Sequence, residues 1–174
     1  YKRLLEPIIV EKMFKGKVLV LYGARQVGKT TLVKGILNAL EGSTRLIDCE
    51  LLENKSILEK RNTEDLFSMI RGFKCVVFDE AQGIHNIGQV LKSMHDHLPE
   101  VQIIATGSSS FDLANAISEP LTGRSLEYTL YPLSLPEMVS TSFDAEQKLF
   151  SIMRFGTYPD IQEGTETERI EKLR

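Results

Sequence analysis

The sequence predicts an α/β fold in which helices cover both faces of a parallel sheet, and three observations predict it. Short apolar runs alternate with segments whose apolar residues recur at helical spacing. The connections between these segments are short, which is typical of strand–helix–strand units. A glycine-containing octet, residues 23–30, follows the first apolar run and precedes a helical segment. Because ligands of such sheets bind at the carboxyl ends of the strands, the octet marks the edge where a site is expected.

The octet reads Gly-Ala-Arg-Gln-Val-Gly-Lys-Thr and matches the phosphate-loop pattern G-x-x-x-x-G-K-[ST]. The run before it, 17–22, is almost continuously apolar, as expected of a strand buried on both faces. Gly23 and Gly28 let successive backbone N–H groups point at one anion, and the start of a helix adds positive potential. The pattern assigns Lys29 to the β- and γ-phosphates and the Thr30 hydroxyl to Mg²⁺. The residues expected to bind nucleotide are Gly23, Ala24, Arg25, Gln26, Val27, Gly28, Lys29, Thr30 and Thr31.

A second apolar run, residues 74–79, ends in two adjacent carboxylates, Asp79 and Glu80. Such an abrupt change is typical of a metal–phosphate site, in which Asp79 holds Mg²⁺ and Glu80 orients and deprotonates the attacking water. The structural alternative is an acidic helix N-terminus. A kinase of small metabolites needs no water-activating Glu, and residues 54–57 lack the Asp of the guanine-reading pattern Asn-Lys-x-Asp. We therefore expect ATP hydrolysis, with Lys29 and Glu80 as catalytic residues.

Three further strands and several helices complete the predicted layout. The strands are 44–49, 101–106 and 126–131. Helices are expected after the phosphate loop, after Asn62 or Thr63, after Asn86, at the Ser134–Glu137 capping box and over 165–174. Because the whole strand 44–49 separates the loop from Asp79, we expect a three-layer P-loop NTPase whose five-stranded parallel sheet has the order 5-1-4-3-2. We assign 1–135 to the P-loop ATPase core and 136–174 to a helical extension leading to a missing C-terminal domain.

Two weaker signals flank the last two strands. Thr106 and Ser108, in the run Ala-Thr-Gly-Ser-Ser-Ser at 105–110, are candidates to contact the γ-phosphate or the attacking water. A serine-rich turn that caps the next helix is compatible with this role. Arg124, before the fifth strand, is a candidate to supply positive charge to the γ-phosphate from its own subunit or a neighbour. A solvated surface arginine is the alternative, and Arg25 in the loop is a second candidate.

Composition bounds the class of protein. The length of 174 residues fits one globular domain. The net charge of −3 argues against a surface devoted to nucleic acid. The two cysteines, Cys49 and Cys75, form no C-x-x-C pair, and no secretory or transmembrane run is present, which predicts a cytoplasmic protein without a membrane partner. The three histidines lack metal-site spacing. The chain starts without Met and ends inside a predicted helix, which indicates a fragment of a longer protein.

Several short strings of this sequence, in the order in which they occur, resemble the prokaryotic AAA+-type ATPases that join an N-terminal P-loop domain to a C-terminal domain of uncharacterised function. The shared strings are 23–32, Phe-Asp-Glu-Ala-Gln at 78–82, 106–110, Leu-Thr-Gly-Arg at 121–124, 131–137, and 155–159 with Thr157 in place of a glycine. The resemblance implies phosphate and Mg²⁺ roles for Lys29 and Thr30, and metal and water roles for Asp79 and Glu80. It also implies the sensor position for Ser108 and offers Arg124 as a possible arginine finger.

Three functions remain open at this stage. The first is a Mg²⁺-dependent ATPase that binds ATP and ADP, with a possible homo-oligomer whose neighbouring subunit supplies an arginine. The second is a nucleotide-dependent switch, in which ATP holds one conformation and hydrolysis resets it. The third is a nucleic-acid-associated ATPase, with a protein or DNA partner bound through the missing C-terminal domain.

Overall fold

The structure is a computed structural model that describes residues 1–60, 62–108 and 110–172. Ser109 of the serine-rich turn and the last two positions of the helix expected over 165–174 therefore lie outside the described residues. Within the described part of the chain, no helix combines the length and the apolar composition needed to cross a bilayer.

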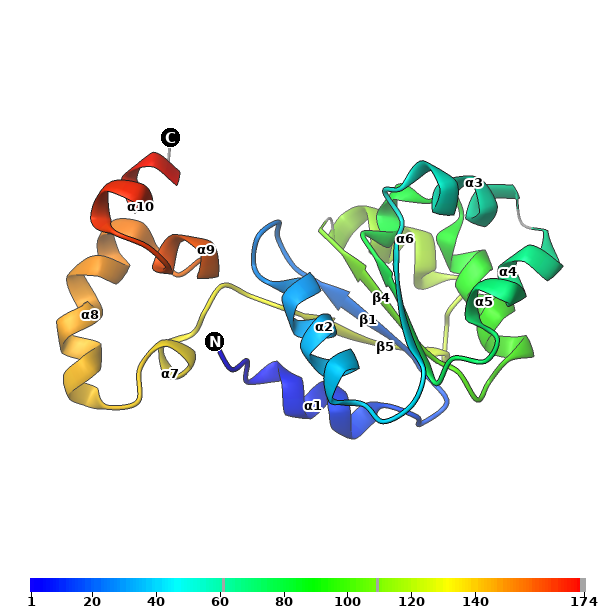
Figure 1. The fold of residues 1–174 in the computed structure, drawn as a ribbon, viewed down its shortest axis with the longest axis horizontal. Helices are drawn as coiled ribbons and strands as arrows, with labels where there is room; N and C mark the ends of the chain where they lie inside the picture. Colours follow the sequence, from blue (N-terminus) through cyan, green and yellow to red (C-terminus); the bar gives the residue numbers. More distant parts are fainter. Residues whose placement is uncertain (61, 109, 173–174) are drawn as a thin grey trace.

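A parallel sheet forms the centre of the molecule (Figure 1). Its strands are β1 (Val18–Tyr22), β2 (Thr44–Asp48), β3 (Cys75–Asp79), β4 (Gln102–Gly107) and β5 (Ser125–Thr129). The spatial order is β2-β3-β4-β1-β5, and every neighbouring pair is parallel. Read from the other edge, this is the predicted order 5-1-4-3-2, which is confirmed. The central strands β1, β3 and β4 are buried throughout, as their apolar sequences predict.

Helices cover the two faces of the sheet and make three layers. One face packs against α3 (Leu52–Lys60), α4 (Thr63–Ile70), α5 (Ile87–His97) and α6 (Ser110–Ser118). The opposite face packs against α1 (Leu5–Lys12) and α2 (Lys29–Ala39). The side chains of each strand alternate between these two cores, so that Val18 and Val20 belong to the first and Leu19 and Leu21 to the second. Parallel strands require this double cover because neither face can remain in water.

The helix starts that the sequence predicts are mostly correct. Asn62 caps α4, since its side chain accepts hydrogen bonds from the backbone N–H groups of Glu64 and Asp65. Asn86 precedes α5 but has a left-handed backbone and makes no side-chain cap. Helices α1 and α3 were not predicted. Only Ile9 of α1 and Leu58 of α3 are buried, so the apolar residues of these helices do not mark a buried face at helical spacing.

Four helices follow the sheet: α7 (Leu135–Met138), α8 (Ser142–Phe155), α9 (Pro159–Gln162) and α10 (Glu166–Lys172). Figure 1 shows them in yellow to red, beside the sheet rather than on either face, with the N-terminus close to them. The capping box of α7 is present, with the backbone N–H of Ser134 donating to Glu137 Oε2 at 2.8 Å. The division into a core of 1–135 and an extension of 136–174 stays a prediction.

Candidate functional site

The phosphate loop joins β1 to α2 at the carboxyl edge of the sheet, and three of its residues have positive φ. The φ angles of Gly23, Gln26 and Gly28 are 158°, 63° and 95°. A Cβ on Gly23 would lie 2.5 Å from the carbonyl oxygen of Leu130, so this position requires glycine. Gln26 adopts a conformation that is rare for residues with a side chain, and such strain is concentrated at functional sites. The surrounding structure therefore holds the loop in a specialised conformation.

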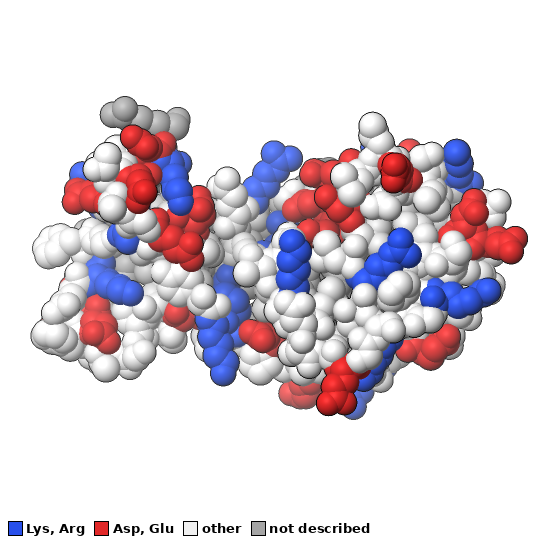
Figure 2. Space-filling model, in the orientation of Figure 1, with Lys and Arg blue, Asp and Glu red and all other residues white. Residues whose placement is uncertain are grey.

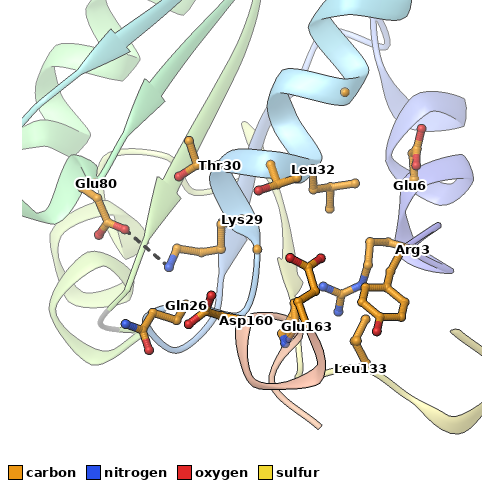
Figure 3. A pocket seen from close by; sticks show the side chains of 15 residues that line it. Arg3, Glu6, Gln26, Lys29, Thr30, Leu32, Glu80, Leu133, Asp160 and Glu163 are labelled. Carbon is orange, nitrogen blue, oxygen red and sulfur yellow. Dashed lines mark ion pairs between the residues drawn. The ribbon is translucent and has the colours of Figure 1, made fainter. Parts of the chain in front are cut away.

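Lys29 is the first residue of α2, and its charged side chain is buried. Its Nζ donates hydrogen bonds to the carbonyl oxygens of Gly23 at 3.0 Å and Ala24 at 3.2 Å. The same nitrogen lies 3.5 Å from Oε1 of Glu80, and Figure 3 marks this ion pair. A buried ammonium group needs such partners. An anion that enters the loop would compete with them for this charge.

Asp79 ends β3 and accepts hydrogen bonds on both carboxylate oxygens. The hydroxyl of Thr30 donates to Oδ2 at 2.8 Å, and the fully buried hydroxyl of Thr106 donates to Oδ1. Thr106 also accepts from the backbone N–H of Glu80 at 3.1 Å. Thr30 and Asp79 come from α2 and β3, and together they present the hard oxygen donors that Mg²⁺ prefers, with few protein ligands beside phosphate and water. The residues present therefore fit Mg²⁺.

Glu80 follows β3 with a left-handed backbone, φ 52°. Its Oε2 accepts hydrogen bonds from Gln82 Nε2 at 2.7 Å and from the backbone N–H of Ser108 at 3.2 Å. Burial alone would raise the pKa of Glu80, but hydrogen bonds from Gln82 and Ser108 and the charge of Lys29 outweigh it, so this pKa is lowered. The carboxylate is therefore ionised near neutral pH, and Oε1 is the oxygen that faces Lys29.

Arg3 joins the site from the N-terminal segment, and sequence reasoning missed it. Its guanidinium group donates to the carbonyl oxygens of Val27 at 2.7 Å and Tyr131 at 2.6 Å. Its Nε lies 3.0 Å from Oε1 of Glu137, and both side chains are buried. One residue thus connects the phosphate loop, the segment after β5 and helix α7. No local motif marks it, because its partners lie far away in the sequence.

A cavity of about 570 Å³, here called the loop pocket, lies between two walls (Figure 3). The sheet wall consists of Gln26, 28–32, Gly35 and Glu80, with Asp79, Thr106 and Ser108 behind them, hydrogen-bonded to Thr30 or Glu80. The helical wall consists of Tyr1, Arg3, Glu6, Leu133, Pro159, Asp160 and Glu163. Figure 3 shows Asp160 and Glu163 pointing toward the start of α2. Pro159 Cγ lies 3.9 Å from where a Cβ on Gly28 would be, so the helical wall packs directly on the loop.

The structure brings most predicted site residues together at this cavity. Gln26, Gly28, Lys29, Thr30, Thr31 and Glu80 line it, and Ser108 lies behind Glu80. The carbonyl oxygens of Gly23, Ala24 and Val27 are occupied by Lys29 and Arg3. Arg25 is exposed on the loop. Of the two sensor candidates, Thr106 has both hydroxyl roles engaged within the protein, as donor to Asp79 and acceptor from Glu80, whereas Ser108 is half-buried.

Arg124 lies at the opposite edge of the sheet from the phosphate loop. It immediately precedes β5, its carbonyl oxygen accepts from the backbone N–H of Val18, and Val18 is the first residue of β1. The loop follows the last residue of β1, about 16 Å farther along the strand at ~3.3 Å per residue. The Nε of Arg124 pairs instead with Oδ1 of Asp96 at 2.9 Å, and this contact lowers the pKa of Asp96. Of the alternatives for Arg124, action on the γ-phosphate of its own chain therefore does not fit this geometry, because parallel strands put residues before and after a strand at opposite edges.

Charged side chains of both signs are interspersed on the face of the molecule that Figure 2 shows. This distribution agrees with the net charge of −3. Acidic side chains gather on the part formed by the last helices, and Lys or Arg side chains lie between them.

Comparison with known proteins identifies the class of domain. The sequence model of a family described as AAA domain matches residues 15–139, more than half of the chain. The chain therefore belongs to this family of P-loop domains. An uncharacterised protein of Methanocaldococcus jannaschii is 26% identical over an alignment of 166 residues that covers 86% of this chain and 37% of that protein. The chain thus spans little more than a third of this relative.

Two solved structures have a similar fold. A Walker-type ATPase of Pyrococcus abyssi matches with a TM-score of 0.58 and 21% identity, over 99% of this chain and 62% of that one. Domain III of the replication initiation protein DnaA from Thermotoga maritima also matches with a TM-score of 0.58, at 17% identity, over 86% of this chain and 67% of that one. At these identities the likeness shows the fold alone, that of an AAA-type P-loop domain.

Proposed function

We propose that this domain binds ATP with Mg²⁺ in the loop pocket and hydrolyses it to ADP and phosphate. One observation carries the proposal: two contacts, Lys29–Glu80 at 3.5 Å and Thr30–Asp79 at 2.8 Å, join the first two residues of α2 to the two carboxylates at the end of β3. This set combines a cation for phosphate, oxygen donors for a metal and a carboxylate for water. The geometry agrees with each role that the motifs predict for these four residues.

Each residue has a distinct task in this proposal. Thr30 and Asp79 would hold Mg²⁺, which supplies positive charge to the phosphate oxygens when it is bound. Lys29 exchanges its contacts with the carbonyl groups of Gly23 and Ala24 for contacts with the β- and γ-phosphates. Glu80 takes a proton from the attacking water through the carboxylate oxygen that Ser108 does not hold. Ser108 lies against Glu80 and would sense the γ-phosphate.

The test separates binding from hydrolysis with two substitutions. Lys29→Ala removes a charged contact to phosphate and should weaken ATP binding by roughly 10- to 100-fold. Glu80→Gln should keep binding within about threefold while turnover falls by about 10²-fold or more, the usual contribution of a positioned base. Nucleotide affinity and phosphate release are measured on both proteins. Lys34→Ala is the matched control, since Lys34 is an exposed lysine on the same helix. Wild-type turnover in Glu80→Gln would remove the general-base assignment.

Arg124 remains a proposal only as a residue that acts on a neighbouring subunit. Its exposed position at the far edge of the sheet leaves the guanidinium group accessible to another copy. Turnover per subunit should then rise with protein concentration. Mixing Arg124→Ala with Lys29→Ala protein should restore activity that neither has alone. Concentration-independent turnover together with an active Arg124→Ala protein would leave the residue as a surface arginine.

A nucleotide-dependent switch is the second candidate. The observation that favours it is the contact of the helical wall with the phosphate loop through Arg3 and Pro159. Nucleotide binding at the loop could therefore change how α7–α10 sit against it. A switch requires slow exchange and hydrolysis, and a partner affinity that depends on whether ATP or ADP is bound.

We further propose a cytoplasmic location, in agreement with the buried, unpaired Cys49 and Cys75.

A DNA-associated role is tested on a longer relative rather than on this domain. The net charge of −3 and the interspersed charges on the face that Figure 2 shows give this domain little electrostatic attraction for DNA, so any DNA contact is expected outside it. ATP turnover of a full-length relative, measured with and without duplex DNA at two salt concentrations, decides the matter. Stimulation that weakens with salt supports DNA as the partner, and its absence supports a protein partner.

A further inference from the structure

Gln82 holds the carboxylate of Glu80 and connects it to Ser108. Its Nε2 donates to Glu80 Oε2 at 2.7 Å and to Ser108 Oγ at 3.1 Å. The backbone N–H of Ser108 donates to the same Oε2 at 3.2 Å. These three residues therefore form a closed set of hydrogen bonds that joins the end of β3 to the end of β4.

The position of Gln82 is fixed by a short turn and by a narrow slot. Gln82 lies in the 3-10 turn Ala81–Gly83, where the backbone N–H of Gly83 donates to the carbonyl oxygen of Glu80 at 3.1 Å. A Cβ on Gly107 would lie 2.9 Å from Gln82 Oε1 and 2.6 Å from Leu113 Cδ2, so the side chain fits only beside a glycine. Its Oε1 is buried and accepts no hydrogen bond from the described residues.

The lack of a donor to this oxygen among the described residues argues against a purely structural role. The hydrogen bond from Gln82 to the charged Glu80 is favourable, but burying an amide oxygen without a donor costs a comparable amount. The net gain in folding free energy is therefore small. What the amide does accomplish is to fix one oxygen of the carboxylate, which leaves Oε1 directed to Lys29 at 3.5 Å.

We propose that Gln82 is a positioning residue for Glu80, and that it transmits the state of Ser108 to the carboxylate. This inference rests on the proposed ATP hydrolysis, since it assigns to Gln82 the orientation of the proposed base. With Oε2 held by Gln82, Glu80 presents Oε1 to the phosphate side of the pocket. A contact between Ser108 and the γ-phosphate would take this hydroxyl from the amide, and the amide and carboxylate would adjust together.

The kinetic test uses Gln82→Met, which keeps the approximate length of the side chain but removes both the nitrogen and the oxygen of its amide group. Turnover should fall by roughly 10- to 100-fold while ATP affinity stays within about threefold, because only the orientation of the base is lost. In the Glu80→Gln background the same substitution should have no further effect. Gln89→Ala is the control, since Gln89 is an exposed glutamine on α5 that lines the same surface pocket as Gln82. An unchanged or raised turnover in Gln82→Met, or an equal loss in both backgrounds, would overturn the inference.

A second measurement does not depend on hydrolysis. In the nucleotide-free protein, the side-chain amide resonances of Gln82 are assigned by their loss in Gln82→Met. Glu80→Ala and Ser108→Ala should each shift these resonances, while those of Gln89 stay in place. Unshifted Gln82 resonances in Glu80→Ala would overturn the inference whatever the turnover. A wild-type protein that binds ATP without hydrolysing it, but shows the shifts, would instead reject the proposed function and support the contact.

Discussion

The two walls of the loop pocket are held in place in different ways. The sheet wall lies at the ends of β1, β3 and β4, which are buried along their whole length and have a hydrogen-bonded strand on each side. The helical wall is built from exposed residues such as Tyr1, Asp160 and Glu163, next to a helix, α8, whose Phe143 and Phe150 are 66% and 82% exposed. Its strongest connection to the loop is the buried Arg3.

This difference separates chemistry from movement. Groups that must keep sub-ångström geometry, Lys29, Asp79 and Glu80, are on the sheet wall, at the start of α2 and the end of the buried strand β3. The helical wall has few buried contacts, so it can open without disturbing the strands. Closing or opening one wall of a pocket is a common way to admit ligand and exclude water. The predictions below test this comparison, starting with the largest expected effect.

Phe78→Ala should destabilise the whole domain because both walls depend on the sheet. Phe78 is fully buried in β3, one residue before Asp79. Removing its ring leaves a cavity that costs about 3 to 5 kcal/mol of unfolding free energy. Urea unfolding measures the loss, and Phe143→Ala on exposed α8 should change stability little. A small effect at Phe78 would mean that the sheet wall is less rigid than its burial indicates.

Arg3→Met should loosen the helical wall alone. The substitution leaves the buried carboxylate of Glu137 without its cation, and the carbonyl groups of Val27 and Tyr131 without their donor, at a cost of about 3 kcal/mol. Hydrogen exchange should become faster in α7–α9 and stay unchanged in β3 and β4. Lys2→Met, one residue away and exposed, is the control. Equal acceleration in the central strands would show that the two walls are not separable.

Acid should weaken the same connection. Burial would raise the pKa of Glu137, but hydrogen bonds from the backbone N–H groups of Ser134 and Leu4 and from Arg3 outweigh it, so this pKa is lowered. A carboxyl group whose pKa is lower in the folded state contributes stability above its unfolded pKa, about 4.3, and loses it as pH falls through the folded pKa. Glu137→Gln should therefore cost about 2 kcal/mol at pH 7 and progressively less below about pH 4. Thermal unfolding across this range, compared with wild type, measures the difference; a constant difference would contradict it.

Asp96→Asn should have the smallest effect. Asp96 pairs with Arg124 at the far edge of the sheet, and both side chains are more than a third exposed. Solvent screening limits such a pair to less than about 0.5 kcal/mol. Stability by urea unfolding and ATP affinity should both match wild type. A large change in nucleotide affinity would require a connection between Arg124 and the loop pocket that the sheet geometry does not provide.

The sequence by itself determined the sheet and the sheet wall. Apolar runs must be buried, their alternation with helices requires a parallel sheet, and the strand between Lys29 and Asp79 gave the order 5-1-4-3-2. The octet and the Asp79–Glu80 pair are local patterns, since the residues within each motif sit next to each other in the chain. For these residues, the carboxyl ends of parallel strands supply the rest of the geometry.

Only the tertiary structure decided which residues from distant parts of the sequence contact one another around the pocket. Arg3 reaches Glu137 across 134 positions, and Gln82 reaches Ser108 across 26. Such contacts leave no periodic or motif signal, because they depend on how separate elements pack. A sequence specifies burial and short-range chemistry directly, whereas the pairing of distant polar groups is decided when the chain folds.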